Sequence, residues 1–208
     1  MDKRISVAVI KRLPRYYRYL GDLLDNDITR ISSNDLAKRM SLTASQIRQD
    51  LNKFGCFGQQ GYGYNVELLY EEIKKILGLD QIYNLVIIGG GNLGQTLANY
   101  SNFGRRGFKF IAIFDKNPKL IGTKINGLEI MDITNLDNFL KQNKVDIAVL
   151  SLPKANAEEV LPTLTKNNIK GIWNFSHVDL KTPEHITVEN VHLTDSLMTL
   201  SYRLSSNK

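Results

Sequence analysis

Cysteine, histidine and long apolar runs are nearly absent from this sequence. Its 208 residues include one cysteine, Cys56, and three histidines. A single cysteine excludes an intrachain disulfide, and no cysteine and histidine cluster has metal-ligand spacing, so we expect no metal centre. No apolar run approaches the roughly 20 residues that span a membrane, and the N-terminus lacks a hydrophobic leader. We therefore expect a protein of the reducing cytoplasm.

Acidic residues are scarce in the first third of the chain. Residues 1–65 contain 11 lysines and arginines against 6 aspartates, whereas residues 66–208 contain 16 against 15 acidic residues. Most of the net charge of +6 therefore lies in the first third. This asymmetry favours a polyanionic partner for that segment, and a solvated basic surface is the alternative interpretation.

The first eighty residues show helical periodicity. We expect a helix from Ile5 to about Asp25, or two helices that meet at Pro14, because proline is tolerated only in a first helical turn. Ser33 is the expected cap of a second helix over residues 34–40.

Thr43 and Gln46 form a capping box that opens a third helix. The Thr43 hydroxyl should accept from the Gln46 backbone N–H, and the Gln46 side chain should reach back. The spacing i, i+4, i+7 predicts an inward face of Ile47, Leu51 and Phe54, with Gly55 ending the helix. The exposed face then carries side chains suited to DNA bases and phosphates, namely Ser45, Gln46, Arg48, Gln49 and Lys53.

Glycines alternate with aromatic residues over residues 57–64, a pattern typical of a small twisted hairpin. Three helices and a hairpin predict a winged helix-turn-helix, whose third helix enters the major groove. Cations of the first helix, Arg12 among them, are expected near phosphates. The wing residues Gln59, Gln60 and Tyr62 are expected near the minor groove. A winged helix used for protein contacts is the alternative.

An amphipathic helix over residues 67–77, ended by Gly78, is the expected connector between two domains, residues 1–80 and 81–208. Beyond it, strands and helices alternate, and continuous apolar strands predict a parallel sheet covered on both faces. We therefore expect an α/β chain, with an N-terminal winged helix and a C-terminal Rossmann, doubly wound domain. The predicted strands lie near 84–88, 109–114, 128–131, 146–150, 170–174 and 186–192, and the helices near 92–103, 135–143, 155–167 and 195–205.

The strand over residues 84–88 runs into a glycine-rich turn and then a helix. About twenty residues later, Asp115 ends a second strand. This is the dinucleotide-binding fingerprint in the structural context that it requires, and an acid at Asp115 favours NAD(H) over NADP(H), because it repels a 2′-phosphate. The predicted phosphate-binding residues are Gly89, Gly90, Gly91, Asn92, Leu93 and Gly94. A glycine-rich turn kept for packing alone is the alternative.

Over nearly its whole length the chain resembles the Rex family of bacterial redox-sensing transcriptional repressors. The most specific shared segments are 45–51, 54–58, 61–64, 89–94, 171–175 and 188–191. The resemblance implies a homodimer that swaps its C-terminal helix. It also implies binding to a palindromic operator with NAD⁺, release by NADH, and control of fermentative and anaerobic-respiration genes.

The resemblance further implies that Tyr100, with Leu193 from the partner's swapped segment, lies near the nicotinamide. A relay between domains would use Arg18, Tyr100 and an acid near the last helix. This sequence departs from the family there, because His192 follows Val191 and the nearest acid is Asp195. His192, Asp195 or a different contact replaces the usual salt bridge.

Three other functions compete with a redox-sensing repressor. A dehydrogenase would need a general acid or base, for which the chain offers His177, His185 and His192 but no separate substrate domain. A CoA sensor is disfavoured by Asp115, because the ribose of CoA carries a 3′-phosphate. A thiol switch at Cys56 is disfavoured because a lone cysteine among aromatic residues is more often inert.

Overall fold

The computed structural model describes residues 6–54, 58–59 and 62–206, and the chain forms two compact units, Met1–Gln81 and Ile82–Lys208. Gly55, Cys56 and Gln60 lie outside the described residues, so the predictions made for them are not addressed. Each unit is described by itself below.

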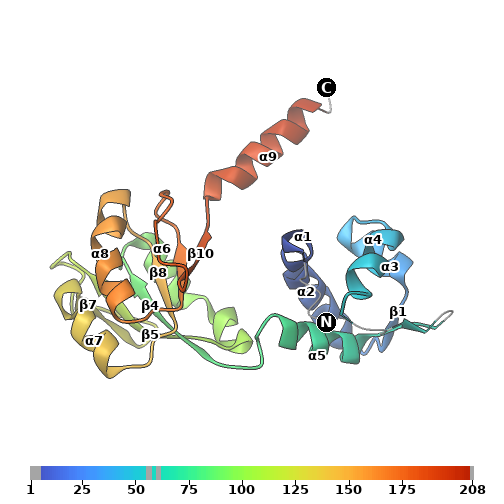
Figure 1. Cartoon of the computed structure of the whole chain (residues 1–208), viewed down its shortest axis with the longest axis horizontal. Helices are drawn as coiled ribbons and strands as arrows, with labels where there is room; N and C mark the ends of the chain where they lie inside the picture. The colour runs from blue at the N-terminus through green and yellow to red at the C-terminus, as the bar shows by residue number, and fades with distance from the viewer. Residues whose placement is uncertain (1–5, 55–57, 60–61, 207–208) are drawn as a thin grey trace. The chain divides into compact units, whose positions relative to one another are not determined.

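The first unit is a helical bundle with a small sheet (Figure 1). Its helices are α1 (Val7–Ile10), α2 (Leu13–Leu24), α3 (Ser33–Met40), α4 (Ala44–Leu51) and α5 (Val66–Ile76). Its strands are β1 (Arg30–Ile31), β2 (Gly58–Gln59) and β3 (Gly63–Asn65). Pro14 lies in the first turn of α2, where its missing N–H costs nothing, so the alternative of two helices in place of one is confirmed.

The caps of α3 and α4 partly follow the sequence prediction. Helix α3 is capped by Ser32, one residue before the predicted Ser33, and the Ser32 hydroxyl accepts from the Asp35 N–H at 3.0 Å. Thr43 caps α4 as expected, accepting from the Gln46 N–H at 3.1 Å. The other half of the capping box is wrong, because the Gln46 side chain does not reach back to Thr43 but donates to Asp50.

The inward face of α4 is formed by Ile47 and Leu51, both fully buried. Helix α4 ends at Leu51, so Phe54 lies beyond the helix, although it still packs against the core of this unit. Helices α2 and α5 contact each other through Tyr17 and Tyr70, whose rings stack with centroids 4.4 Å apart and whose hydroxyls are 2.7 Å apart.

The predicted hairpin is present as β2 and β3, and β1 adds a third antiparallel strand that the sequence analysis missed. Gly63 has φ of +73°, and a Cβ there would lie 2.6 Å from the carbonyl oxygen of Ile31. Only glycine fits this position, because both its backbone conformation and the close approach of β1 exclude a side chain.

The second unit is built on a seven-stranded sheet (Figure 1). Its strands are β4 (Tyr83–Ile88), β5 (Phe108–Asp115), β6 (Lys124–Ile125), β7 (Leu128–Asp132), β8 (Ile147–Leu150), β9 (Gly171–Asn174) and β10 (Thr187–Asn190). Its helices are α6 (Asn92–Asn99), α7 (Leu136–Gln142), α8 (Lys154–Lys166) and α9 (Leu193–Ser206), with 3₁₀ turns η1 (Ser101–Arg106) and η2 (Ile133–Asn135). Strand β6 was not predicted, and the helix predicted over residues 92–103 ran into the η1 turn.

The strand order is β10-β9-β8-β4-β5-β7-β6, and all neighbours are parallel except β6 and β7. Alternate residues of β4 face opposite sides of the sheet. Val86 and Ile88 pack with α7 and α8, whereas Leu85 and Ile87 pack in a separate core with Ala98 of α6. The buried run is therefore apolar at every position, as a sheet covered on both faces requires.

Strand β4 pairs with β5 on one side and with β8 on the other, so the direction of winding reverses at β4. Ligands of doubly wound folds bind in the crevice that forms at the carboxyl ends of the strands at such a switch point. The glycine-rich turn follows β4 and therefore lies at this point.

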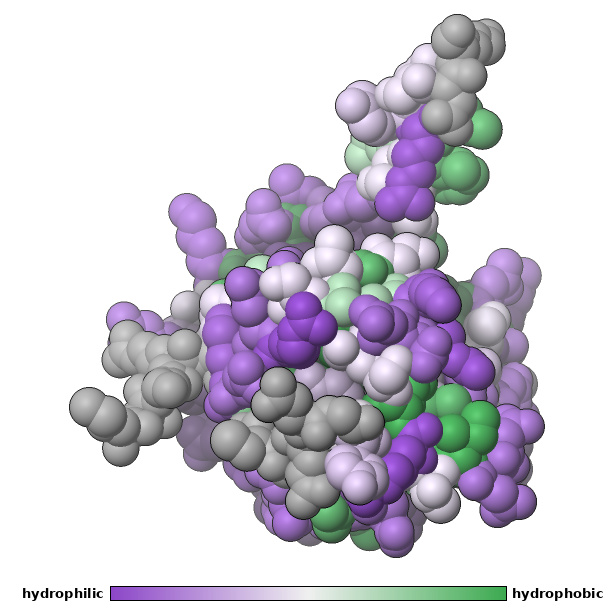
Figure 2. Space-filling model, turned by 90° about the vertical axis from the view of Figure 1, so that its right-hand side faces the viewer, coloured by the Kyte–Doolittle hydropathy of each residue, from purple (hydrophilic) through white to green (hydrophobic). Residues whose placement is uncertain are grey.

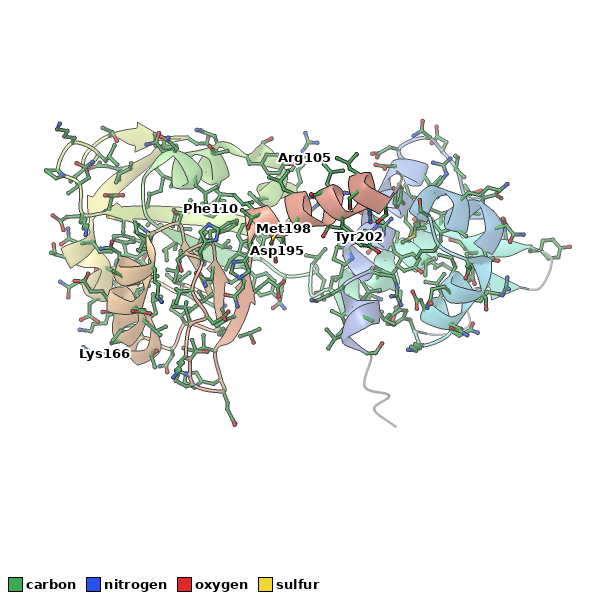
Figure 3. The ribbon with its side chains drawn as sticks, turned by 90° about the horizontal axis from the view of Figure 1, so that it is seen from above. Arg105, Phe110, Lys166, Asp195, Met198 and Tyr202 are labelled. Carbon is green, nitrogen blue, oxygen red and sulfur yellow. The ribbon has the colours of Figure 1, made fainter. Side chains whose placement is uncertain are left out.

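Helix α9 begins at Leu193, two residues earlier than predicted, and buries none of its residues. Leucines 193, 197, 200 and 204 recur at helical spacing and are all more than half exposed. Apolar side chains line one flank of this helix at the top of Figure 2. Asp195 lies near its base, and Met198 and Tyr202 follow along it (Figure 3).

Candidate nucleotide site and nucleic-acid interface

The glycine-rich turn is fixed by two glycines that no other residue can replace. Gly89 has φ of +109°, and a Cβ there would stand 2.4 Å from the carbonyl oxygen of Ser151. At Gly94 a Cβ would stand 2.0 Å from the carbonyl oxygen of Gly89. The first glycine therefore allows the turn after β4, and the third lets α6 pack against it.

Gly91 differs from these two, because, its chain neighbours apart, no described atom lies within 4 Å of the position of its Cβ. It precedes α6, and no side chain caps this helix. The space beside Gly91, at the uncapped start of α6, is thus open. This arrangement fits a phosphate, which an uncapped helix N-terminus attracts through its N–H groups and its dipole.

Asp115 ends β5 beside the glycine-rich turn. One carboxylate oxygen accepts from the Gly90 N–H at 2.6 Å and the other from the Asn117 N–H at 2.7 Å. A carboxylate offers about four acceptor positions, so about two remain after these bonds. The remaining positions fit ribose hydroxyl donors, and the two backbone bonds hold the carboxylate in place for them.

A cavity of about 290 Å³ adjoins Asp115 at the carboxyl ends of β4 and β5. It lies between the side chains of α7 and α8, and its lining mixes apolar and polar groups. The lining residues include Phe114, Asp115, Ile133, Leu152, Asn156 and Val160. A cavity of this size holds one part of a dinucleotide rather than the whole molecule.

Most of the predicted DNA-reading side chains lie on α4, where Ser45, Arg48 and Gln49 are exposed and Gln46 is half-buried. Lys53 is also exposed, but it lies beyond the end of the helix. The Arg48 guanidinium donates to the Ser33 hydroxyl at 3.1 Å, which ties this face of α4 to the start of α3. In the wing, the Arg30 guanidinium carbon lies 5.9 Å from the ring centroid of the exposed Tyr62.

Asp50 is the functional-site residue that the sequence analysis missed most clearly. It lies on α4 with no exposed surface, and its carboxylate accepts from the Arg12 guanidinium at 2.7 and 2.8 Å. It also accepts from the Tyr16 hydroxyl at 3.0 Å and from the Gln46 amide at 2.8 Å. The predicted phosphate contact of Arg12 therefore competes with a structural ion pair between α2 and α4.

These bonds set the charge of the network. Burial alone would raise the pKa of Asp50, but the hydrogen bonds from Arg12, Gln46 and Tyr16 outweigh it, and the pKa lies below its ordinary value. Burial, together with the neighbouring carboxylate, raises the pKa of the Tyr16 hydroxyl. The carboxylate is therefore charged and the tyrosine is a neutral donor at physiological pH.

The predicted switch residues lie in both units. Arg18 is exposed on α2, with its guanidinium carbon 5.4 Å from the Tyr19 ring centroid. In the second unit the Tyr100 ring contacts Phe103 edge to face, with centroids 5.1 Å apart. The His192 ring stacks on His177, with centroids 5.8 Å apart. Leu193 and Asp195 are exposed at the start of α9, and a relay through all these residues remains a prediction.

Two polar side chains that support the glycine-rich turn also escaped the sequence analysis. The Ser151 hydroxyl donates to the Gly89 carbonyl at 2.8 Å, and the Gln95 amide donates to the Gly90 carbonyl at 2.7 Å. Gln95 is separated from Gly90 by five residues, but Ser151 follows a different strand, so only the sheet topology reveals its role.

Among the residues that the structure describes, no group of histidine, cysteine, aspartate and glutamate side chains is arranged to hold a metal ion. Within the same part of the chain, every helix is too short or too polar to traverse a bilayer.

Two family models match the chain. Residues 80–178 match a family described as a CoA binding domain, and residues 4–52 match one described as a putative DNA-binding protein N-terminus. The two matched segments correspond to the nucleotide site and to the helices around α4.

Relatives match the chain over its whole length. It is 57% identical over 207 residues to the redox-sensing transcriptional repressor Rex of Clostridium novyi (strain NT), and the match covers 99% of each chain. A crystal structure of RSP with β-NAD⁺ and operator DNA shares 56% identity and a TM-score of 0.91, covering 99% of this chain and 95% of that one. A crystal structure of RSP with β-NADH shares 53% identity and a TM-score of 0.91, covering 99% of this chain and 97% of that one.

These matches confirm the predicted fold class, a DNA-binding N-terminal domain followed by a Rossmann-like domain. The relatives are named as regulators of transcription, so the dehydrogenase alternative is set aside. The chain belongs to the Rex family of redox-sensing transcriptional repressors.

Proposed function

We propose that this chain represses transcription by binding operator DNA through α4 and the wing, and that it leaves the operator when NADH binds to its Rossmann unit. The observation that carries the proposal is the presence, in one chain, of an exposed Arg-bearing helix face and a nucleotide site in which Asp115 and the glycine-rich turn are joined at 2.6 Å. The full-length similarity to RSP bound to operator DNA supports it.

The ADP half of NAD(H) fits the site in three parts. The open side of Gly91 and the uncapped start of α6 receive the pyrophosphate, Asp115 accepts from the ribose hydroxyls, and the adjoining cavity takes the adenine. Asp115 also selects against a 2′-phosphate, because two negative charges would then lie side by side.

The nicotinamide end supplies the redox signal. Tyr100, together with Leu193 from a partner subunit, forms an apolar surface on which a neutral dihydronicotinamide loses little hydration. A cationic nicotinamide loses much more on entering the same surroundings. NADH therefore favours the arrangement that closes around it, and NAD⁺ does not, which is the differential affinity that a ligand-driven switch requires.

The exposed apolar stripe of α9 is our reason for proposing a second subunit. The leucine stripe of this helix is exposed, and a helix with an apolar stripe gains stability by burying it. A homodimer that exchanges α9 buries the stripe and brings Leu193 to the partner's nucleotide site. Two winged helices per dimer then suit a palindromic operator in the cytoplasm.

The relay between the units joins Arg18 and Tyr100 with an acid. His192 stands after Val191, where its ring stacks on His177, and the nearest acidic residue is Asp195. In our proposal Arg18 is held by Tyr100 and Asp195 in the NADH-bound state.

Two substitutions separate the two halves of this function. Gly91→Val places a side chain where the structure is open, at a φ of −70° that any residue adopts, so the fold should persist while the phosphate site is blocked. We expect the variant to bind operator DNA but to resist release by NADH. Gly104→Val, at an equally open glycine that is not part of the glycine-rich turn, is the matched control.

Arg48→Ala should have the opposite effect, with NADH binding intact and operator affinity reduced by about tenfold or more. Fluorescence anisotropy of a labelled operator duplex measures DNA binding, and NADH fluorescence measures nucleotide binding. If NADH released operator DNA from the Gly91→Val protein as it does from the wild type, the proposed phosphate site would be contradicted. Release by CoA but not by NADH would favour the CoA sensor.

A further inference from the structure

Gln46 occupies a special place on the DNA-reading face. It is the third residue of α4, in the turn predicted to enter the major groove, and in the sequence it lies between the exposed Ser45 and Arg48. Unlike them it is half-buried, because its Nε2 donates to the Oδ1 of Asp50 at 2.8 Å.

The orientation of this amide is determined by its partner. A carboxylate only accepts hydrogen bonds, and Asp50 is fully buried, with further donors from Arg12 and Tyr16. Turning the amide around would place its oxygen against the carboxylate oxygen. Gln46 therefore directs Nε2 toward Asp50, and no described residue donates to its Oε1.

We propose that Gln46 reads the operator as an anchored hydrogen-bond acceptor, whose Oε1 accepts a hydrogen bond from the exocyclic amino group of adenine or cytosine, and that Asp50 is the positioning residue for this contact. The inference rests on the proposed function, since it needs a DNA-binding α4. It assigns a chemical preference to one side chain of that helix.

Anchoring explains why such a contact discriminates. Adenine and cytosine present an amino group in the major groove, whereas thymine O4 and guanine O6 and N7 are acceptors. A free glutamine amide rotates to suit either kind of group. An amide held by Asp50 cannot, so its oxygen would face another acceptor at a wrong base, and the lost hydrogen bonds penalise that base.

The matched comparison is Gln49. It lies on the same helix and is exposed, without the tie to Asp50 that Gln46 has. We expect Gln49 to adapt to its base or to contact backbone phosphates, and to contribute little to the discrimination assigned to Gln46.

The test begins with an operator selected by this protein from a random duplex library. Each adenine is then replaced singly by purine, and each cytosine by 2-pyrimidinone, so that only the amino group is removed. At one position per half-site, we expect the wild-type protein to lose about fivefold to tenfold in affinity. The identity of that base, adenine or cytosine, distinguishes the two sources of the amino group.

In the Gln46→Met variant, deleting the amino group at that position should not lower the operator affinity further. In the Gln49→Met variant, the same deletion should lower the affinity as much as it does for the wild-type protein. An operator that tolerates every amino deletion would overturn the inference while leaving the proposed function intact. The same holds if Gln46→Met keeps the sensitivity. If no sequence is enriched, the proposed function and this inference fall together.

The role of Asp50 is tested by a readout that a merely structural role would not move. Asp50→Asn should weaken the discrimination between the selected base and an acceptor base at that position. Arg12→Met should lower the thermal stability yet retain the discrimination, because Gln46 keeps its bond to Asp50. Equal loss of discrimination in both variants, measured well below their unfolding temperatures, would reduce Asp50 to a structural residue.

Discussion

The Asp50 carboxylate is charged and removed from solvent, so its burial is tolerated only because hydrogen-bond donors surround it. Arg12 supplies two of its four hydrogen bonds and its only full positive charge among the described contacts. When one member of a buried ion pair is deleted, the other stays behind as an uncompensated charge. The link between α2 and α4 is therefore sensitive to Arg12.

We expect Arg12→Met to lower the free energy of unfolding of the first unit by about 3 kcal/mol at pH 7. Urea unfolding followed by circular dichroism measures this change. Arg39→Met, at an exposed arginine of α3, is the control and should change stability little. An equal loss in both variants would show that Asp50 does not depend on its partner.

The same network predicts how the destabilisation caused by Arg12→Met depends on pH. The folded-state pKa of Asp50 is lowered, so its stabilising contribution is complete above the unfolded value of about 4 and is lost as the pH falls through the folded value. In Arg12→Met, protonation relieves the uncompensated charge. The stability difference between the two proteins should therefore shrink on acidification below about pH 4, and a difference that widens would contradict the account.

In our proposal, Asp115 sets the preference between NADH and NADPH. Asp115→Asn removes the charge that repels a 2′-phosphate, so the preference for NADH over NADPH should fall by about tenfold. Fluorescence titration with both nucleotides gives the ratio. Asp132→Asn, at the aspartate that ends the neighbouring strand β7, is the control, and an unchanged ratio at Asp115→Asn would assign the preference elsewhere.

The residues that could be predicted from the sequence are those whose role is local. The glycine-rich turn and Asp115 follow from spacing along two strands, and the structure joins them. Asp50 and Ser151 escaped prediction because their partners lie far away in the chain, 38 residues for Arg12 and 62 for Gly89. An acidic residue within a DNA-reading helix gives no signal in the sequence that it faces inward.

Among whole elements, long periodic segments were predicted within a few residues, and very short ones were missed. Strands β1 and β6 have two residues each, too few to show an alternating pattern. They exist because a neighbouring strand pairs with them. Likewise, α6 ends at Asn99, and the periodicity alone did not separate it from the η1 turn, which contains the aromatic residue Phe103.

Helix α9 is the element through which we propose that two copies of the chain associate. Leu200→Glu places a charge in the leucine stripe, and we expect the dimer dissociation constant to rise by about a hundredfold or more, because the charge would be buried on association. Sedimentation velocity measures the change. Thr199→Glu, on the opposite side of the helix, is the control. A dimer that tolerates Leu200→Glu would place the interface on another element.

At the scale of the whole molecule, the proposed function requires that one equilibrium link two compact units. The first unit carries the α4 face and the second carries the nucleotide site. If NADH releases the operator as proposed, NADH and operator DNA must weaken each other's binding by the same factor. NAD⁺ should show little or no such effect, since it lacks the neutral ring that favours the closed arrangement.

The most direct test is a titration of the protein–operator complex with NADH and, separately, with NAD⁺, at fixed salt and fixed protein concentration. Fixed salt matters because phosphate contacts make DNA affinity strongly dependent on ionic strength. We expect NADH to release the operator at concentrations at which NAD⁺ leaves it bound. Equal release by both nucleotides, or by neither, would contradict the claim that this chain reports the redox state of the nicotinamide pool.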